Sequence, residues 1–182
     1  MKIFDNRSFT KVFFIAGVWL SVASTGLCAA TPSLPVTVLD NNGYGAAFWD
    51  VTGTSTRDVY VATETLGTWD PAVRISTAGK YSFSPLAAIT STGNIVAVWS
   101  VLDNTTHNQL LYYATLPHGG SWSTPTLISD PTTTSQAGYK VEITDGGQIL
   151  ITWKWFSSSN FETHISAATG LFGGTLTSVQ LD

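Results

Sequence analysis

The sequence predicts an all-β protein made of three tandem four-stranded antiparallel repeats, and three observations support this fold class. One glycine-to-tryptophan spacing, with an apolar run between the two residues, occurs at Gly43–Trp49, Gly93–Trp99 and Gly147–Trp153. Three stretches of equal length, GTWDPAVRIS, GSWSTPTLIS and GGTLTSVQLD, follow these runs and begin at Gly67, Gly120 and Gly173. The tryptophans recur about every 50 residues, which is the period of a small supersecondary unit.

Each repeat is expected to contain four strands. The first strands are VTVL (36–39), LAAI (86–89) and KVEI (140–143), the second are GAAFWDV (45–51), NIVAVWSV (94–101) and QILITWKW (148–155), and the third are DVYVAT (58–63), LLYYAT (110–115) and THISAA (163–168). The fourth strand is the end of each closing stretch. The segments LDNNGY, TSTGN and TDGGQ supply the positive φ that a hairpin turn needs. The strands are rich in β-branched and aromatic residues and lack helical periodicity, so little helix is expected.

Composition agrees with a folded domain and excludes one class of partner. The chain is 43% hydrophobic and only 11% charged, which is too apolar for a disordered protein. Its formal net charge is -4. Beyond the N-terminal segment the basic residues form no stripe that could bind phosphates, so no nucleic-acid partner is expected. These residues are Arg57, Arg74, Lys80, Lys140 and Lys154.

The N-terminus predicts an export signal covering residues 1–30. Lys2, Arg7 and Lys11 precede an apolar run from residue 12 to residue 23, and the small-residue end GLCAA follows. A membrane anchor is the alternative, but the run is shorter than the about 20 residues that a membrane-spanning helix needs. The protein is therefore expected in the bacterial periplasm, at the cell surface or in the medium, with no membrane span after the signal is removed.

The single cysteine, Cys28, lies inside this predicted signal. Lipid attachment is a weaker alternative to simple cleavage after Ala30, because Leu27 and Thr25 do not fit the positions before a lipidated cysteine. A chain cleaved after Ala30 holds no thiol, so neither disulfides nor cysteine chemistry is expected.

Residues 31–182 are predicted to form one repeat domain, with repeats at about 36–76, 84–129 and 137–182. Four antiparallel strands cannot bury both faces alone, and a β-propeller solves this problem because each sheet covers its neighbour. From Val36 to Asp182 the chain resembles exported propeller-repeat proteins, including the sialidase-like folds, through the marks G-x-x-x-x-x-W and G-x-W-x-x-P-x-x-I-S. The sialidase turn signature S-x-D-x-G-x-x-W is absent.

Three repeats make only a partial propeller, because propellers typically have four to eight blades. Two chains could close a six-bladed ring as a homodimer, the chain could be a fragment of a longer propeller protein, or the strands could form a β-sandwich instead. Asp182 aligns with Ser76 and Ser129, so the sequence stops at a repeat boundary. This alignment favours a self-contained module.

Three tryptophans are the candidate ligand-binding residues, as platforms on which sugars could stack. Trp69 and Trp122 follow a glycine near a turn, and Trp155 has no counterpart in the other repeats, where valines stand. For each of them, packing inside the fold is the competing interpretation. The repeated tryptophans, Trp49, Trp99 and Trp153, are expected to pack between neighbouring repeats.

No catalytic, metal or cofactor site is predicted. His107, His118 and His164 lack metal-ligand spacing. Glycosidases need two carboxylates across a cleft, but most of the carboxylates here are expected in solvated turns or at strand ends. The set comprises Asp50, Asp58, Glu64, Asp70, Asp103, Asp130, Glu142, Asp145 and Glu162. The resemblance to sialidases implies three arginines around the substrate carboxylate, and the chain after residue 30 has only Arg57 and Arg74.

The predicted function is an exported binding or interaction module for a glycan or a protein ligand. The alternatives are a glycoside hydrolase of the sialidase type and an inactive fragment of a longer propeller protein. Carboxylates and arginines that converge at one mouth of a channel would favour an enzyme. Equivalent aromatic residues in several grooves between repeats would favour a lectin.

Overall fold

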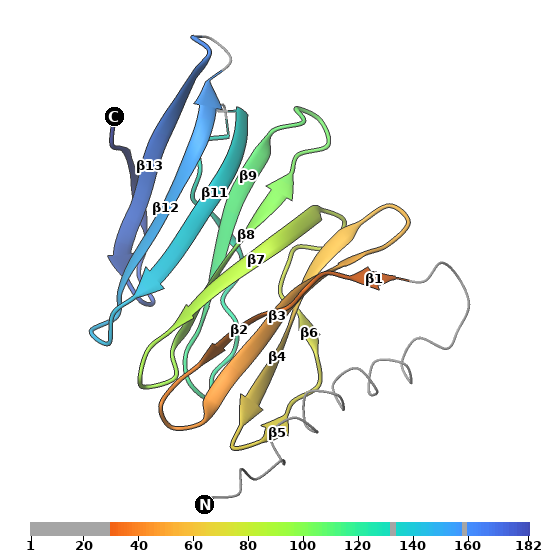
Figure 1. Ribbon diagram of the computed structural model, residues 1–182, viewed down its shortest axis with the longest axis vertical. Helices are drawn as coiled ribbons and strands as arrows, with labels where there is room; N and C mark the ends of the chain where they lie inside the picture. The colour runs from red at the N-terminus through yellow and green to blue at the C-terminus, as the bar shows by residue number, and fades with distance from the viewer. Residues whose placement is uncertain (1–29, 132–133, 158–159) are drawn as a thin grey trace, which may run out of the picture. The chain divides into compact units, whose positions relative to one another are not determined.

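The strands of the computed structural model account for the whole regular structure of the described residues, which are 30–131, 134–157 and 160–182 (Figure 1). Fourteen strands and no helix occur in these ranges, so the all-β prediction is confirmed. The strands form two hydrogen-bonded sheets, and neither is closed into a barrel. The predicted signal segment, residues 1–30 with Cys28, lies almost entirely outside the described residues and stays a prediction.

Each repeat is an antiparallel meander of four strands, as predicted. The first repeat consists of β2 (Val36–Leu39), β3 (Tyr44–Thr52), β4 (Arg57–Thr65) and β6 (Val73–Arg74), with β1 (Thr31–Pro32) and β5 (Thr68–Trp69) added at its edges. The second consists of β7 (Tyr81–Ile89), β8 (Ile95–Leu102), β9 (Gln109–Leu116) and β10 (Thr126–Leu127). The third consists of β11 (Thr134–Ile143), β12 (Gln148–Ser157), β13 (Glu162–Leu171) and β14 (Thr177–Gln180). A parallel bridge between Arg57 and Tyr81 joins the first two meanders.

Glycines with positive φ close equivalent turns in all three repeats. Between the first and second strands they are Gly43, Gly93 and Gly147, with φ of 82°, 82° and 79°. Only glycine adopts this region without steric cost, which explains the repeated spacing. Between the third and fourth strands the corresponding residues are Gly67, Gly119 and Gly173. The sequence alignment, which matched Gly120 to the other two, is therefore one residue off at this turn.

The last residue of each repeat holds the third strand in the same way. Its side-chain oxygen accepts a hydrogen bond from a backbone N–H of that strand. The pairs are Ser76 with Val59 at 3.0 Å, Ser129 with Leu111 at 2.9 Å and Asp182 with Ile165 at 3.1 Å. The predicted alignment of Asp182 with Ser76 and Ser129 is thus confirmed by geometry.

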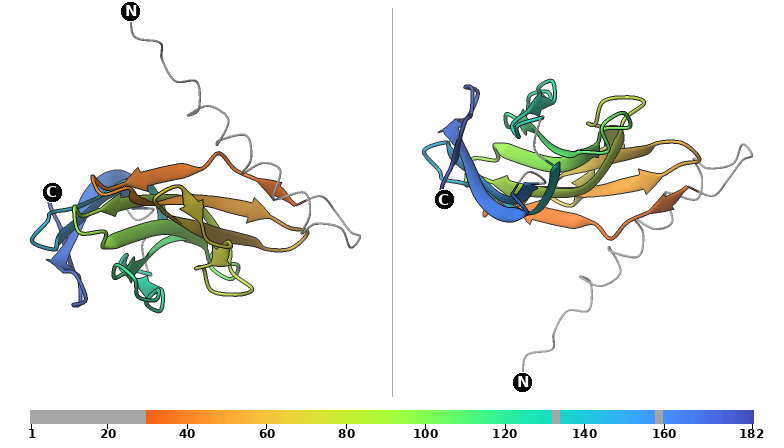
Figure 2. Two further views of the ribbon diagram at one scale, coloured as in Figure 1. Left: turned by 90° about the horizontal axis from the view of Figure 1, so that it is seen from below. Right: turned by 90° about the horizontal axis from the view of Figure 1, so that it is seen from above.

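Two apolar cores lie between successive repeats, and Figures 1 and 2 show the three repeats in chain order from orange through green to blue. The first core joins Phe48 of the first repeat with Trp99 of the second, and the next core joins Val98 of the second repeat with Trp153 of the third. Face-to-face packing of sheets is common to a propeller and to the predicted alternative, a sandwich. The closed propeller ring therefore stays a prediction.

Trp99 and Trp153 lie between neighbouring repeats, as expected, but Trp49 does not. Trp99 and Trp153 each face the preceding repeat, and among the described residues no repeat precedes the one that contains Trp49. Trp49 is buried and its ring stacks on Tyr60, with the ring centres 6.3 Å apart.

In the part of the chain that the structure describes, no helix is long and apolar enough to cross a membrane.

Candidate functional site

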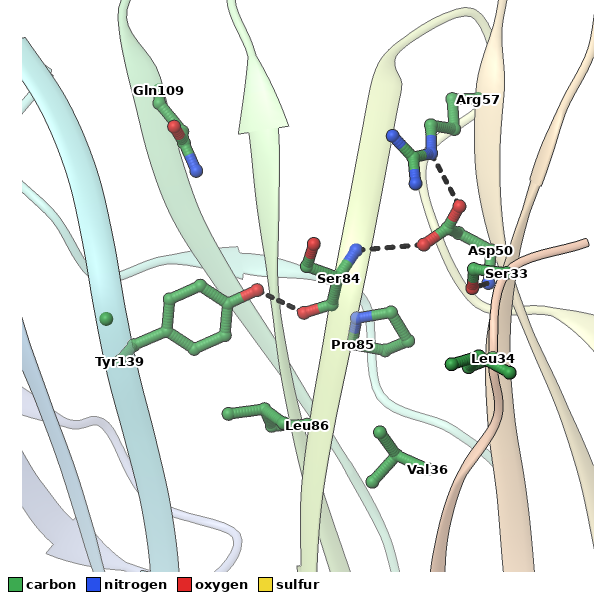
Figure 3. Close-up of a pocket in the computed structure, with 11 residues that line it drawn as sticks. Ser33, Leu34, Val36, Asp50, Arg57, Ser84, Pro85, Leu86, Gln109 and Tyr139 are labelled. Atoms are coloured by element: carbon green, nitrogen blue, oxygen red, sulfur yellow. Dashed lines mark hydrogen bonds and ion pairs between the residues drawn. The ribbon is translucent and has the colours of Figure 1, made fainter.

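The first strands of the three repeats run side by side and meet at a hollow of about 530 Å³, here called the inner-strand pocket (Figure 3). Every repeat contributes to its lining, so the pocket exists only when the three repeats pack together. The residues that line it are Ser33, Leu34, Val36, Asp50, Arg57, Ser84, Pro85, Leu86, Gln109, Gly138 and Tyr139.

A buried carboxylate anchors one wall of the inner-strand pocket. The side chain of Asp50 is 1% exposed, and one of its oxygens lies 2.5 Å from Nε of Arg57. Its other oxygen accepts a hydrogen bond of 3.0 Å from the backbone N–H of Ser84. A buried charge is costly unless it is paired and hydrogen-bonded, and both conditions hold here.

A bulge in β7 makes the Ser84 N–H available to Asp50. The register between β7 and β8 shifts between Phe83 and Leu86, and Ser84 has a φ of 55°. An extra residue at a bulge leaves the ladder of the sheet, so its N–H can turn to another acceptor. The bulge therefore couples the first and second repeats at the pocket.

Arg57 presents the hydrogen-bond donors of the pocket. Its guanidinium uses Nε for Asp50, lies 5.2 Å from the ring centre of Phe83, and leaves the side chain 26% exposed. Within the described ranges the two terminal nitrogens, Nη1 and Nη2, have no hydrogen-bond partner, and Figure 3 shows them on the side away from the Asp50 carboxylate. The ion pair with Asp50 therefore fixes a fork of free donors beside the pocket.

The third repeat and β9 complete the polar lining. The Tyr139 hydroxyl donates a hydrogen bond to the carbonyl oxygen of Ser84. Burial raises the pKa of Tyr139, so its hydroxyl stays protonated at neutral pH. Gln109 donates from Nε2 to the Ser100 hydroxyl at 2.8 Å, which leaves its Oε1 as an acceptor. The tyrosine thus acts as a fixed donor and wall, with no role as a base.

Aliphatic side chains form the remaining wall of the pocket. They are Leu34, Val36, Pro85 and Leu86. Together with the Arg57 donors and the Gln109 acceptor, this wall suits a small polar ligand that also has C–H faces. Among the residues that line the pocket, Asp50 has the only carboxylate.

A second hollow of about 680 Å³, the inter-repeat groove, lies between the first and second repeats. Trp122 lines it together with Tyr44, Asp70 and His118. The Trp122 ring packs edge-on against Phe48, with the ring centres 5.8 Å apart. This tryptophan therefore serves the core between the repeats and also borders a groove.

The other two candidate tryptophans lie elsewhere. Trp69 is exposed on β5 in the first repeat. Trp155 donates its indole N–H to the Ser166 hydroxyl at 3.0 Å, and its ring lies 4.5 Å from that of His164. Trp69, Trp122 and Trp155 come from three different repeats, and none of them lines the inner-strand pocket. Their role in binding stays a prediction.

Sequence reasoning missed the Asp50–Arg57 pair, because Asp50 was expected to be solvated at a strand end. One signal was present: Asp50 directly follows Trp49 inside an apolar strand, where the other repeats carry Ser100 and Lys154.

The described residues contain no group of three or more His, Cys, Asp or Glu side chains that could hold a metal ion.

The structure is similar to two solved structures of carbohydrate-active proteins. One is the endo-arabinase from Bacteroides thetaiotaomicron VPI-5482, with a TM-score of 0.51 and 14% identity over 81% of this chain and 61% of that one. The other is the polysaccharide lyase Uly1, with a TM-score of 0.59 and 14% identity over 80% of this chain and 40% of that one. This chain thus spans less than two thirds of either. The sequence matches no family model and has no significant match among curated proteins, so the likeness shows the fold alone.

Proposed function

We propose that this protein is an exported glycan-binding module and that the inner-strand pocket holds the sugar. The observation that carries the proposal is the pair of unpartnered Arg57 nitrogens, held in place by buried Asp50 beside an aliphatic wall. Sugars carry hydroxyls on their edges and C–H groups on their faces, so they match such a mixed lining.

Charge favours a neutral sugar over a polyanionic one. Asp50 balances the charge of Arg57, so the pair leaves the pocket close to neutral. The chain as a whole has a formal net charge of -4, which repels polyanions at long range. Sugar hydroxyls are therefore the groups expected to accept hydrogen bonds from Arg57.

The fold likeness supports a carbohydrate ligand in general terms. The two similar structures are named as an arabinase and a polysaccharide lyase. Fold alone does not define an activity. The pocket chemistry, more than the likeness, therefore supports the proposal.

Binding is better supported than hydrolysis. Glycosidases of the usual kind place two carboxyl groups about 5 to 9.5 Å apart across the scissile bond. The inner-strand pocket has one carboxylate, and Arg57 and Ser84 already occupy both of its oxygens. A sialidase-type hydrolase is consequently the weaker candidate.

Calorimetric titration with neutral oligosaccharides, among them arabino-oligosaccharides, tests the proposal. Arg57→Lys keeps a positive charge beside Asp50 but removes the fork of donors, so Kd should rise about 10-fold or more. Arg74→Lys is the matched control, because Arg74 lines neither hollow and lies 3.9 Å from Asp58.

Two results would contradict the proposal. One is the absence of binding to every neutral oligosaccharide tested, and the other is an equal effect of Arg57→Lys and Arg74→Lys. Chromatography of the same mixtures after long incubation would reveal shortened oligosaccharides if the protein were a hydrolase.

A further inference from the structure

The inter-repeat groove differs from the inner-strand pocket in the charge of its lining. In the inner-strand pocket the one carboxylate, Asp50, is paired with Arg57. In the inter-repeat groove the one carboxylate is that of Asp70, and no lysine or arginine lines the hollow. Within the described ranges Asp70 has no ion-pair partner. The groove therefore carries an unbalanced negative charge, with His118 as the only basic side chain in its lining.

Hydrogen bonds to Thr63 hold the Asp70 carboxylate at the edge of the groove. The Asp70 backbone N–H donates to the carbonyl oxygen of Thr63 at 2.9 Å, and the Thr63 hydroxyl donates to Oδ2 of Asp70 at 2.6 Å. Oδ1 accepts no hydrogen bond from the described residues. Because Asp70 is an exposed residue that lines the hollow, this oxygen can accept a hydrogen bond from a ligand.

The second repeat shows that the fold does not need a charge at this position. Asp70 corresponds to Ser123 in the closing stretches GTWDPAVRIS and GSWSTPTLIS. The Ser123 N–H donates to the carbonyl oxygen of Thr115 at 2.8 Å, and its hydroxyl accepts the Thr115 N–H at 2.9 Å. A neutral side chain therefore closes the equivalent turn, so the carboxylate of the first repeat is additional to what the turn requires.

Aromatic rings form one wall of the groove. Tyr44 at the start of β3 and Trp122 in the closing stretch of the second repeat both line it. The Tyr44 ring packs edge-on against His118, with the ring centres 4.5 Å apart. A Cβ atom at Gly93 would clash with the His118 ring, so this ring lies directly against the turn of the second repeat. These contacts fix the wall before any ligand binds.

The aromatic wall and the carboxylates favour the same kind of ligand. Burial raises the pKa of Tyr44, and the charges of Asp70 and Asp40 raise it further. The tyrosine therefore lies in the negative field of two carboxylates. The faces of tyrosine and tryptophan rings also attract cations, through the quadrupole of the ring.

Aliphatic side chains line much of the rest of the groove. They are Val61, Pro71, Val73 and Leu116. Val73 is 50% exposed, so part of this apolar surface is open to solvent. Apolar surface of this kind binds the methylene stem of a long amine while the charged end stays beside polar groups. The volume of about 680 Å³ is within the usual range for small-ligand sites.

We propose that the inter-repeat groove binds an alkylammonium ion. The ammonium group lies between Asp70 and the aromatic wall, and the methylene stem lies along Pro71 and Val73. Free amines and the lysine side chains of peptides share this chemistry. The groove and the inner-strand pocket have no lining residue in common, so this ligand and the proposed sugar bind independently.

An NMR titration of the full chain at pH 8, where histidine is ordinarily uncharged, tests the proposal. One arm uses 1-aminobutane, with 1-butanol as its neutral analogue. The other arm uses a blocked glycyl-lysyl-glycine peptide, with norleucine in place of lysine in its neutral analogue. Each cation should shift the amide signals of Gly119, Gly120 and Ser121, with a Kd at least about 5-fold below that of its analogue. The cation with the lower Kd identifies the source of the ammonium group.

Substitutions of Asp70 test the role of its charge. Asp70→Ser copies the residue of the second repeat and should raise the Kd of either cation about 5-fold, the effect of losing one exposed ion pair. Asp70→Asn is a second variant, because its amide oxygen still accepts the Thr63 hydroxyl. Glu142→Gln is the matched control, since it removes one negative charge at a residue that lines neither hollow, and it should change Kd less than about 2-fold.

Three results would overturn the proposal. The first is that neither cation shifts the signals of the groove. The second is that the neutral analogues bind as tightly as the cations, and the third is that Asp70→Ser and Glu142→Gln change Kd equally. None of these results bears on the binding of sugar at Arg57.

Discussion

The second and third repeats have the same four-stranded meander, but they differ in how many of their faces are covered. In β8 every residue from Ile95 to Val101 is buried, because repeats pack on both sides of that strand. In β12 buried residues alternate with exposed ones such as Leu150 and Lys154. The comparison teaches that β8 is covered on both faces by neighbouring repeats, whereas β12 is covered on one.

The largest expected difference concerns the tryptophans. Trp99 is buried in the core between the first two repeats, so Trp99→Ala should lower the free energy of unfolding by about 3 to 5 kcal/mol. Trp69 is exposed on β5, so Trp69→Ala should cost about 0.5 kcal/mol. Denaturation with urea measures both values. Equal losses would mean that Trp99 does not belong to a core between the repeats.

A pair of equivalent residues compares the two repeats directly. Val96→Ala removes two buried carbons and leaves a cavity, so it should cost about 2 kcal/mol. Leu150→Ala acts on the exposed face of the third repeat and should cost less than about 1 kcal/mol in single chains. Urea denaturation at low protein concentration gives these numbers. A larger loss for Leu150→Ala than for Val96→Ala would reverse the comparison.

The closing residues should show a smaller difference. Ser129 is buried and accepts the N–H of Leu111, so Ser129→Ala leaves a buried donor unpaired at a cost of about 1 to 2 kcal/mol. Asp182 makes the equivalent bond at an exposed position, where water can replace it, and Asp182→Ala should cost about 0.5 kcal/mol. Thermal unfolding of both variants checks the order. The reverse order would show that the two bonds are not equivalent.

The smallest effect is expected from acid at the turns that link the second and third repeats. The Ser91 N–H donates to Asp145 at 2.7 Å, and this hydrogen bond lowers the pKa of the Asp145 carboxyl below its usual 3.8. A lowered pKa in the folded state adds stability above pH 3.8, which is lost as the pH falls through the folded pKa.

Unfolding midpoints of the unaltered chain and of Asp145→Asn, measured from pH 6 to pH 3, reveal this effect. The advantage of the unaltered chain should shrink toward the acid end. A constant difference across the range would show that ionisation of Asp145 has no part in the contact.

Local pattern was enough to predict the repeats, and tertiary pairing was needed for the pocket. A short stretch of sequence is enough to specify a turn or the face of a strand. The turns are closed by Gly43 and Gly93, and the strand faces that pack between repeats carry Trp99 and Trp153. Trp49 was predicted to pack between neighbouring repeats because Trp99 and Trp153 occupy the same position. This prediction was wrong, because among the described residues no repeat precedes the one that contains Trp49.

The pocket depends on contacts between distant segments. Ser84 reaches Asp50 only because of the bulge in β7, and Tyr139 joins Ser84 from the third repeat. No spacing in the sequence reports such contacts. The same limit applies to Trp155, whose indole N–H is satisfied by Ser166 on the adjacent strand.

A side-chain NMR titration with the best-binding neutral oligosaccharide tests most directly whether the inner-strand pocket holds sugar. The Nε–H signal of Arg57 and the amide signals of Gln109 should shift in a saturable way, while the indole signals of Trp69 and Trp155 stay in place. Shifts of those indole signals or of Trp122, with none at Arg57 and Gln109, would contradict the proposed site and place binding on the tryptophans.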